Sequence, residues 1–572
     1  MSYDTGNVIS LLYPSVNAEY KIMTDVTAHD LGLDYIVKKV TEDLREQQMI
    51  MRILTRMTAS PEVAEYRQDI YDDFCRLPEL RTKLLDLMNR IEYLKDYGTW
   101  RKNADEKPGL WDLLHRLDEL VTYITCIESL NECLSDERIR AKGLIDLKKY
   151  IEDLYSEGNF EAMKKDLQNV KTDASDIRSV TIGINVNQRF EAESLGLISV
   201  NSKSFRKSGI VSNFADALAS RDKINDGTDW DGDMRYEPAD QPETDSVMDK
   251  VDKTTMAMAK YTNPILMSSE ATIAKVPDGD GTANSTFYLS NVATKMTAHL
   301  VKRLRSTLSL YSDISIVVIS KLIPELIYYI RFAEFMEQAA KKGSPITKPE
   351  VRKCDDKITM EAFGFYNIKL AVNPDITEEI VTNDLTFDRD RLIYLLTGAN
   401  RGGKTTLTQA VGQLFVLAQG GIHVPCSRFS YKPVDMIFTH FPADEDKTMD
   451  LGRLGEECVR FRESYSSATS LSLLLLNESF STTSYEEGYY IAVDAVRAIR
   501  KKEIRTIYNT HMHKLASDID LDGVSSIVMA SEGGKRSYKV IEKAPEGSSY
   551  ARDIAARYGV TYEMLTGDQQ LD

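Results

Sequence analysis

The stretch 397–406 constrains this chain more than any other, because it has the pattern of a phosphate-binding loop. It reads Thr397-Gly398-Ala399-Asn400-Arg401-Gly402-Gly403-Lys404-Thr405-Thr406. Both glycines, the lysine and the hydroxyl residue of G-x-x-x-x-G-K-[ST] stand in their fixed positions. The apolar run 392–396 before the loop predicts a buried strand, and the apolar spacing in 407–418 predicts a helix. Strand, loop and helix thus follow in the order that the motif requires.

Each residue type in this loop has a physical reason to be there. Glycines let backbone N–H groups close around phosphates, and the start of a helix favours negative charge. Lys404 is expected to contact the β- and γ-phosphates, and the Thr405 hydroxyl is expected to bind Mg²⁺. We therefore predict nucleotide binding by Gly398, Ala399, Asn400, Arg401, Gly402, Gly403, Lys404, Thr405 and Thr406.

Composition limits the class of protein. The 572 residues are enough for roughly three or four domains. The net charge of −17 argues against a surface that binds nucleic acid throughout, so any DNA contact must be local or depend on assembly. The six cysteines lack C-x-x-C spacing, which favours core thiols in a reducing compartment. No secretory signal is found in residues 1–17, and polar residues interrupt the apolar segment 314–330, so we expect a cytoplasmic protein without a membrane span.

Patterns of apolar residues divide the chain into helical and α/β parts. Helical spacing runs from about residue 31 through most of the first 178 residues and again through 290–344, where Pro324 is expected to break or kink the helix. Beyond residue 344, strand and helix patterns alternate as in a sheet with crossover helices, so the predicted fold class is α plus α/β in several domains. The expected domains are a helical core or lever (1–178), a small β-containing insert with an acidic loop (179–289), a returning lever helix (290–344) and a phosphate-loop α/β domain (345–572).

The insert combines strand patterns with an acidic run. Apolar residues alternate with small or polar ones at 179–186 and 197–200, as in half-buried strands. The acidic run 220–249 is typical of a solvated loop. Alternating aspartates at 229–233 also fit a Ca²⁺ loop, but Met234 stands in place of the turn glycine. We therefore expect a solvated loop rather than a calcium site.

A second part of the predicted site follows the apolar run 471–476, which ends in Asn477 and Glu478. In enzymes with a phosphate-binding loop, the first of these positions is normally an aspartate that helps to hold Mg²⁺, and the adjacent glutamate polarises the attacking water. Glu478 is therefore the candidate general base. Asn477 keeps an oxygen but lacks the charge, so we expect it to bind Mg²⁺ through water and to leave the metal more dependent on Thr405 and the phosphates. The alternative is an ordinary polar strand end at a turn.

A third part is the strand pattern 506–510, which ends before His511. His511 is a candidate catalytic residue that donates to the γ-phosphate or to the attacking water. A lone histidine is also commonly an ordinary polar loop residue. A metal site at the nearby His513 is disfavoured, because no partner carboxylate or cysteine stands close to it in the sequence.

In this order, the motifs resemble those of the MutS family of DNA mismatch-repair ATPases, most strongly from about residue 383 to residue 560. The family's phosphate loop T-G-P-N-M-G-G-K-S-T corresponds to 397–406. Its V-P-A, P-V-D-x-I-F-T-R, D-E-x-x-x-G-T-S, A-T-H-Y-x-E-L and G-x-S-x-Y-G segments correspond to 424–426, 433–440, 477–484, 509–515 and 547–551. The helical first half is compatible with the family's core and lever domains.

The resemblance implies an ABC-like ATPase that uses ATP and Mg²⁺ and works as a dimer, with each site completed by the partner. It also implies helical levers that close around double-stranded or branched DNA. In three places the sequence departs from the family's pattern. The family's mismatch-reading module with its Phe-x-Glu wedge has no counterpart, so direct mismatch reading is not expected. The G-R-S-T segment that reaches the partner's γ-phosphate is Gly452-Arg453-Leu454-Gly455, without the hydroxyl, and Ile380 stands where an aromatic residue usually stacks on adenine.

These observations leave three functional hypotheses. The first is a slow ATPase in DNA repair or recombination, in which ATP binding switches a homodimer between open and closed forms on DNA. The second is an interaction scaffold that dimerises in response to nucleotide and does not bind DNA, which the net charge of −17 favours. The third, a transporter ATPase, is weaker because the L-S-G-G-Q signature is absent from the sequence.

Overall fold

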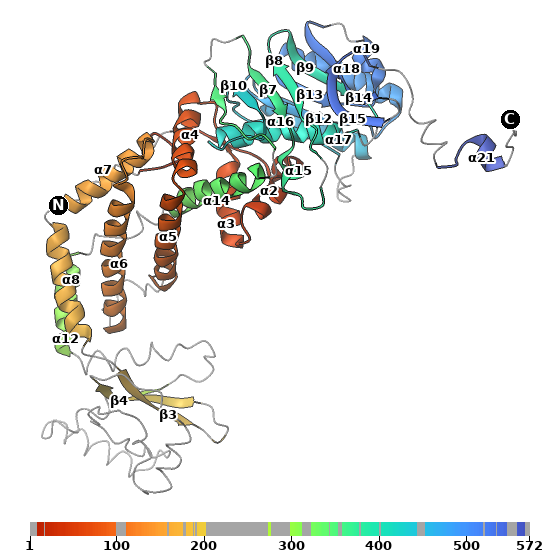
Figure 1. Cartoon of the computed structure of the whole chain (residues 1–572). Helices are drawn as coiled ribbons and strands as arrows, with labels where there is room; N and C mark the ends of the chain where they lie inside the picture. Colours follow the sequence, from red (N-terminus) through yellow and green to blue (C-terminus); the bar gives the residue numbers. More distant parts are fainter. Residues whose placement is uncertain are drawn as a thin grey trace, which may run out of the picture. The chain divides into compact units, whose positions relative to one another are not determined.

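The protein is described here by a computed structural model, shown in Figure 1. The residues that it describes are 9–15, 18–98, 110–156, 159–175, 179–186, 188, 192–201, 273–275, 298–311, 322–341, 344–352, 357–376, 379–399, 402–442, 452–518, 521–532, 535–545 and 558–566. The chain forms two compact units, each of which is discontinuous in sequence. One comprises Met1–Tyr3, Asp86–Glu132 and Tyr150–Ser320, and the other comprises Asp4–Leu85, Cys133–Lys149 and Lys321–Asp572.

The first unit combines long helices with a small sheet. Its main helices are α6 (Leu110–Leu134), α8 (Asn159–Ser175) and α12 (Ala298–Ser309), and its sheet has the order β3 (Ser179–Val186), β4 (Ala192–Asn201), β5 (Ile273–Lys275). Helices α8 and α12 pack together. Both strand patterns predicted in the insert are confirmed, and the strands pair antiparallel. The acidic run 220–249, with the aspartates weighed as a calcium loop, lies outside the described residues.

The second unit begins with helices whose starts are specified by the sequence. They are α1 (Asp25–Asp30), α2 (Leu33–Val40), α3 (Leu44–Leu54), α4 (Pro61–Arg76), parts of α5 (Pro78–Gly98) and α7 (Lys142–Ser156), and later α14 (Ile323–Ala340). Side-chain oxygens of Thr24, Asp43 and Ser60 accept bonds from the first free N–H groups of α1, α3 and α4. Pro324 lies in the first turn of α14, so it begins this helix instead of bending it, because its missing N–H needs no partner there.

A six-stranded sheet forms the centre of the second unit. Its order is β11 (Ile437–His440), β12 (Leu473–Asn477), β13 (Arg505–Asn509), β9 (Arg391–Thr397), β14 (Gly523–Glu532), β15 (Lys535–Glu542). Neighbouring strands are parallel up to β14, and β15 closes the sheet as the antiparallel arm of a hairpin. The α/β alternation predicted after residue 344 is confirmed.

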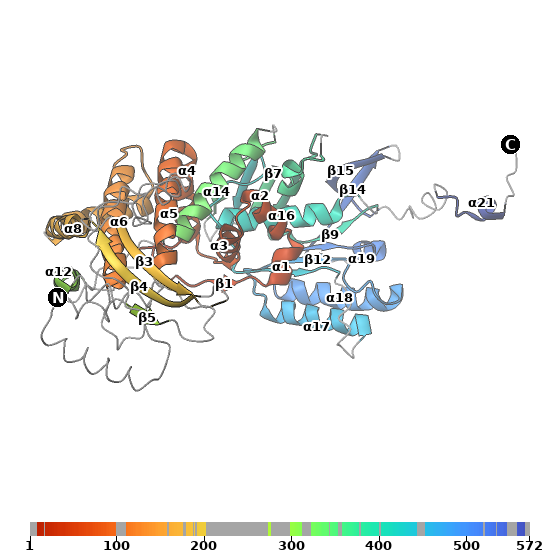
Figure 2. The same cartoon turned by 90° about the horizontal axis from the view of Figure 1, so that it is seen from below.

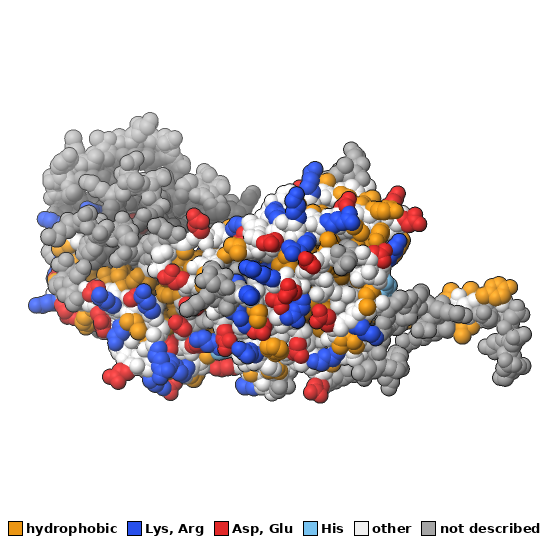
Figure 3. Space-filling view, turned by 90° about the horizontal axis from the view of Figure 1, so that it is seen from above, with side chains coloured by type: hydrophobic (Ala, Val, Ile, Leu, Met, Phe, Trp, Pro, Cys, Tyr) orange, Lys and Arg blue, Asp and Glu red, His pale blue; other side chains and the backbone are white. Residues whose placement is uncertain are grey.

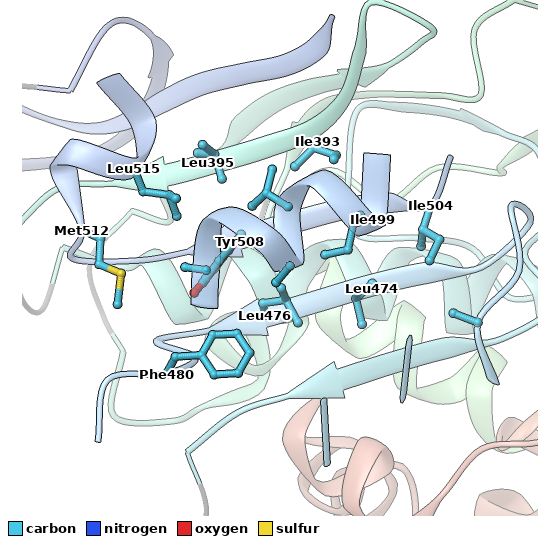
Figure 4. Close-up of a cluster of buried hydrophobic side chains, with 14 residues drawn as sticks. Ile393, Leu395, Leu474, Leu476, Phe480, Ile499, Ile504, Tyr508, Met512 and Leu515 are labelled. Atoms are coloured by element: carbon cyan, nitrogen blue, oxygen red, sulfur yellow. The ribbon is translucent and has the colours of Figure 1, made fainter. Parts of the chain in front are cut away.

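Helices cover both faces of this sheet. Figure 2 shows α16 (Lys404–Gln419) on one side and α17 (Gly452–Ser467) and α18 (Tyr485–Lys501) on the other. Because both faces are covered, every residue of β12 and β13 is buried, which is typical of parallel strands. Figure 4 shows the core on the α18 side, where Leu474, Leu476 and Tyr508 of the strands meet Ile499 of α18 and Leu515 of α19 (His513–Asp518). This packing fixes the strand ends that carry the predicted site.

A second, four-stranded sheet borders the phosphate loop. Its order is β6 (Glu350–Val351), β10 (Arg428–Tyr431), β7 (Met360–Phe365), β8 (Asn383–Phe387). The short helix α15 (Ile368–Val372) follows β7, and its cap residue Asn367 donates to the Thr406 carbonyl at 3.0 Å. The turn between β7 and α15 is thereby fixed beside the start of α16.

Three glutamines tie α16 to the N-terminal helices. The side-chain amides of Gln409, Gln413 and Gln419 donate to the carbonyls of Asp30, Leu31 and Thr58, at 2.7, 2.9 and 2.9 Å. Glutamine is an ordinary helix former that does not compete for its own backbone, so it can bridge two elements in this way. A displacement of α16 would therefore be passed directly to α1 and to the residues around it.

Gly421, just after α16, makes the closest backbone approach in this contact. Its φ is +85°, and an added Cβ would lie 2.5 Å from Arg67 Cβ and 2.7 Å from the Arg67 carbonyl carbon. We expect Gly421→Ala to lower the free energy of unfolding by about 2–4 kcal/mol, because backbone strain and overpacking act together. Gly559→Ala is the matched control, since Gly559 has a φ of +70° with open space around it, and it should cost only about 1–2 kcal/mol of backbone strain. Equal losses for the two variants in urea unfolding would contradict this expectation.

Candidate nucleotide-binding site

The phosphate loop joins β9 to α16 through two glycines with positive φ. Gly398 has a φ of +132° and Gly403 a φ of +92°, and the Gly402 N–H donates to the Ala399 carbonyl at 3.1 Å. A Cβ on Gly398 would lie 3.0–3.2 Å from atoms of Met529, so the loop has no room for a side chain there. Asn400 and Arg401, which the sequence also assigned to nucleotide binding, lie outside the described residues. Thr405 and Thr406 are in the first turn of α16.

Lys404 is nearly buried and points back into its own loop. Its Nζ donates to the carbonyls of Gly398 and Ala399 at 3.0 and 3.2 Å, and 5% of the side chain is exposed. Burial lowers the pKa of the Lys404 ammonium, and the nearby Glu478 carboxylate opposes this shift. A phosphate would offer this cation a full negative charge in place of two neutral carbonyls. The lysine is therefore placed to exchange its loop contacts for a phosphate.

Polar residues meet where three parallel strands end. Asn477 of β12 is in register with Asn509 of β13, which in turn is in register with Leu396 of β9. The Asn477 Oδ1 accepts the Thr405 hydroxyl at 3.1 Å and also accepts a bond from the Asn509 side-chain amide. Two donors thus orient the Asn477 oxygen toward the start of α16. Sequence reasoning gave Asn509 no role, although its place at the end of the adjacent strand could have indicated one.

Glu478 and His511 form a pair at the same edge. His511 Nε2 lies 2.9 Å from Glu478 Oε1, and both side chains are partly exposed. The hydrogen bond from His511 lowers the pKa of the Glu478 carboxyl, with a further contribution from Lys404. Glu478 is therefore ionised at neutral pH, as a proton acceptor must be. His511 contacts the carboxylate that was predicted to be the base, so a role in orienting Glu478 stands beside the predicted contact with phosphate.

A cavity of about 520 Å³ opens over these residues. Besides the loop and Glu478, it is lined by Phe365, Tyr366 and Asn367 from the end of β7, by 379–381, and by Met529 and Tyr538 from the β14–β15 hairpin. Its size is that of a small-molecule or cofactor site. Lys404 and Glu478 both line it, so the loop and the carboxylate belong to one site.

Tyr538 is a cavity residue that the sequence did not indicate. Its φ of +57° is unusual for a residue with a side chain, and its ring lies 3.3 Å from where a Cβ on Gly403 would be. Asn383 holds the backbone that follows Tyr538, donating to the Tyr538 carbonyl at 3.1 Å and accepting from the Val540 N–H at 2.7 Å. Ile380, which aligns with the family's stacking aromatic, lines the same cavity. Tyr538 thus supplies an aromatic ring near the phosphate loop from another strand.

The segment 452–455 begins α17. Gly452 has a φ of +67° with open space around it, and Leu454 packs against the core between the sheet and α18. A leucine here contributes to packing where the family pattern has a hydroxyl. In the part of the chain that the structure describes, no helix is long and apolar enough to cross a membrane, and no three His, Cys, Asp or Glu side chains form a metal-binding group.

Comparison with known proteins agrees with the geometry of this site. The family model for MutS domain V matches residues 394–567, and the model for the MutS2 N-terminal domain matches residues 59–225. The chain thus contains a region similar to MutS domain V and another similar to the MutS2 N-terminal domain. The resemblance read from the sequence is therefore confirmed. The C-terminal part of this mixed helical and sheet protein is a MutS domain V, and that match contains Lys404, Glu478 and His511.

Individual MutS-family relatives match over about a third of the chain. The DNA mismatch repair protein MutS of Staphylococcus haemolyticus is 26% identical over 196 residues, 33% of this chain and 22% of that protein. MutS of Chlorobium phaeobacteroides is 30% identical over 197 residues, 33% of this chain and 22% of that protein. Endonuclease MutS2 of Thermus thermophilus is 27% identical over 212 residues, 36% of this chain and 28% of that protein. The matched segments thus span about a quarter of these relatives.

Proposed function

We propose that this chain is an ATPase with an ABC-like phosphate-loop domain that uses ATP and Mg²⁺ to switch a homodimer on double-stranded or branched DNA, in repair or recombination. The observation that carries this proposal is that Lys404, Thr405 and Glu478 line one cavity at the edge of the sheet. Asn477 is hydrogen-bonded to Thr405 and His511 to Glu478 at the same edge. MutS-family proteins are ATPases, and the relatives' names refer to DNA mismatch repair and to an endonuclease. The four domains expected from the sequence remain part of this proposal.

Each of these residues has a separate role in ATP hydrolysis. The loop N–H groups and Lys404 bind the phosphates, and Tyr538 packs against the nucleotide at the mouth of the cavity. Glu478 accepts a proton from the attacking water, and His511 orients the carboxylate through its 2.9 Å contact. The contact with His511 keeps Glu478 ionised, so the carboxylate is ready to accept the proton.

The oxygens of Thr405 and Asn477 fit Mg²⁺, because they are hard donors 3.1 Å apart and the Asn477 oxygen is oriented by two hydrogen bonds. Both are neutral. When bound with the nucleotide, Mg²⁺ would neutralise phosphate charge. The chain's own residues therefore hold the metal only weakly, and slow turnover follows from this together with the leucine at position 454.

Asn477→Asp tests the consequence of this neutral pair. The added charge should weaken ATP binding without metal and strengthen it with metal, so the ratio of Kd in EDTA to Kd in Mg²⁺ should rise about 10-fold. Titration of a fluorescent ATP analogue in the two buffers measures this ratio. Asn509 can donate to either carboxylate oxygen, so the fold should tolerate the change. An unchanged ratio would show that position 477 does not sense the metal.

An interaction scaffold without DNA binding is the second candidate. The net charge is −17, and on the face seen in Figure 3 acidic and basic side chains are interspersed. Binding of duplex and branched DNA, measured by fluorescence anisotropy at low and high salt with and without ATP, separates the two candidates. The DNA switch predicts binding that weakens with salt and responds to ATP. Absence of binding at low salt, with ATP hydrolysis intact, would favour the scaffold.

A further inference from the structure

The backbone that follows β12 is strained on both sides of Ser479. Glu478 has a φ of +53° and Phe480 a φ of +63°, in the left-handed region that residues with side chains rarely adopt. Each such residue costs of order 1–3 kcal/mol and persists only where its surroundings hold it. The direction in which Glu478 leaves the strand is therefore set by the contacts of this turn.

Ser479 is the fixed point of the turn. It is 1% exposed, and its Oγ lies 2.6 Å from Nδ1 of His440, the last residue of β11. Its carbonyl accepts the Tyr508 hydroxyl at 2.9 Å. The Glu478 N–H donates to the Asn509 carbonyl at 2.8 Å. Side chains from two different strands thus hold the residue that stands between the two strained positions.

His440 makes its contact in one protonation state and one orientation. Its Nε2 lies 3.1 Å from the Glu457 carbonyl, which can only accept, so Nε2 carries the hydrogen and Nδ1 accepts from Ser479. Burial lowers the pKa of the His440 imidazole to about 4, so the ring is neutral at physiological pH. The rings of Phe461 and Phe480 pack beside it, with centroids 6.1 and 5.8 Å away. The imidazole therefore links Ser479 to the Glu457 carbonyl in a fixed orientation.

The other end of this link is α17. Glu457 belongs to that helix, and its carboxylate accepts the Thr482 hydroxyl at 2.9 Å, which makes a second link to the same turn. Helix α17 begins with Gly452 to Gly455, the segment that resembles the family's partner-facing G-R-S-T. The turn after Glu478 is thus held from the helix that carries this segment.

We propose that His440 is a positioning residue for hydrolysis. Through Ser479 it fixes the turn that aims the Glu478 carboxylate, while Glu457 of α17 fixes the ring. This inference rests on the proposed ATPase function and deepens it, because it names the side chain through which α17 acts on the general base. His440 lies at the end of β11, away from the cavity lining, so its loss should change the rate of hydrolysis and leave nucleotide affinity unchanged.

The test compares single-turnover ATP hydrolysis with the Kd of a fluorescent ATP analogue in the full chain. Ser479→Ala removes only the hydroxyl, and His440→Ala removes the ring. Each should lower the hydrolysis rate at least 10-fold with Kd within about 3-fold, because a small misplacement of a catalytic group costs one to two orders of magnitude. His440→Asn places an oxygen near the Nδ1 position and should recover most of the rate, while His440→Gln, which reaches the Nε2 position, should not.

Two comparisons separate positioning from general damage. The double variant His440→Ala/Ser479→Ala should be no slower than Ser479→Ala. That single variant already removes both the bond to the imidazole and the bond to the residue 440 carbonyl. His423→Ala is the control, because His423 is bonded through its Nε2 to Asp72 at 2.8 Å and does not line the cavity, and its rate should be that of the wild type.

Several results would overturn the inference. If Ser479→Ala hydrolyses ATP at the wild-type rate, the inference is wrong, even if His440→Ala fails to fold. Equal losses of rate and affinity, or multiplying effects in the double variant, would overturn it as well. A wild-type protein that does not hydrolyse ATP overturns the proposed function together with this inference, whereas normal wild-type hydrolysis with an unaffected Ser479→Ala overturns the inference alone.

Discussion

We expect Lys404→Ala to lower the affinity for ATP at least 100-fold and to abolish ATP hydrolysis as well. Among the cavity-lining residues that the structure describes, Lys404 is the only cation, and the carboxylates of Glu379 and Glu478 line the same cavity. Without the lysine, a triphosphate would enter a cavity of net negative charge. The effect is large because the ammonium is nearly buried, where charge interactions are screened far less than at a surface.

The fold should not suffer from this change. Lys404 is bonded to two backbone carbonyls of a glycine-rich loop, and a buried charge held by neutral partners contributes little to stability. Isothermal titration calorimetry with ATP measures the affinity, and circular dichroism checks the fold. Lys369→Ala is the matched control, because Lys369 lies on the adjacent α15 and does not line the cavity. Retained ATP affinity in Lys404→Ala, or equal losses in the two variants, would contradict the proposed site.

Glu478→Gln gives the second large effect, a hydrolysis rate at least 100-fold lower with ATP affinity kept within a few-fold. The amide has the shape of the carboxylate and can still accept the bond from His511, but it cannot take a proton from water. Glutamine and glutamate are equally strained at a φ of +53°, so the backbone cost is matched between the two proteins. The variant should therefore bind ATP and hold it.

Single-turnover kinetics gives the rate of hydrolysis, and nucleotide titration of the same preparations gives the ATP affinity. Glu379→Gln provides the control, since it neutralises another carboxylate of the same cavity that has no contact with His511, and its rate should stay within about twofold. A Glu478→Gln protein that hydrolyses ATP at the wild-type rate would show that another group accepts the proton. A parallel loss of affinity would show that Glu478 binds the nucleotide rather than activating water.

Much of the α/β part was predictable from the sequence. The strands were found because parallel strands covered on both faces are continuous apolar runs, as 473–476 shows, and because polar residues stand where such runs end. The start of α14 was predicted less well. Pro324 indicated either a break or a kink, and the structure has a helix that begins at Ile323 rather than one that bends at the proline. A proline in an apolar stretch has the same local signature in both cases.

The candidate site was predictable only in the residues that local motifs contain. Lys404, Thr405, Asn477, Glu478 and His511 were named from loops and strand ends, and the structure brings them together. Their chemical roles remain predictions. The adjacent contributors Asn509, Tyr538 and His440 carry no motif of their own.

The sequence by itself determined the resemblance to the MutS family and the phosphate loop, because both depend on residues that are close together in the chain. Tertiary structure alone decided which distant side chains support them: the order β11-β12-β13-β9 places His440 next to Ser479 and Asn509 next to Asn477. Strand order is set by how helices cover the two faces of the sheet, which is a property of the whole packed unit. Short-range sequence patterns therefore do not reveal the strand order.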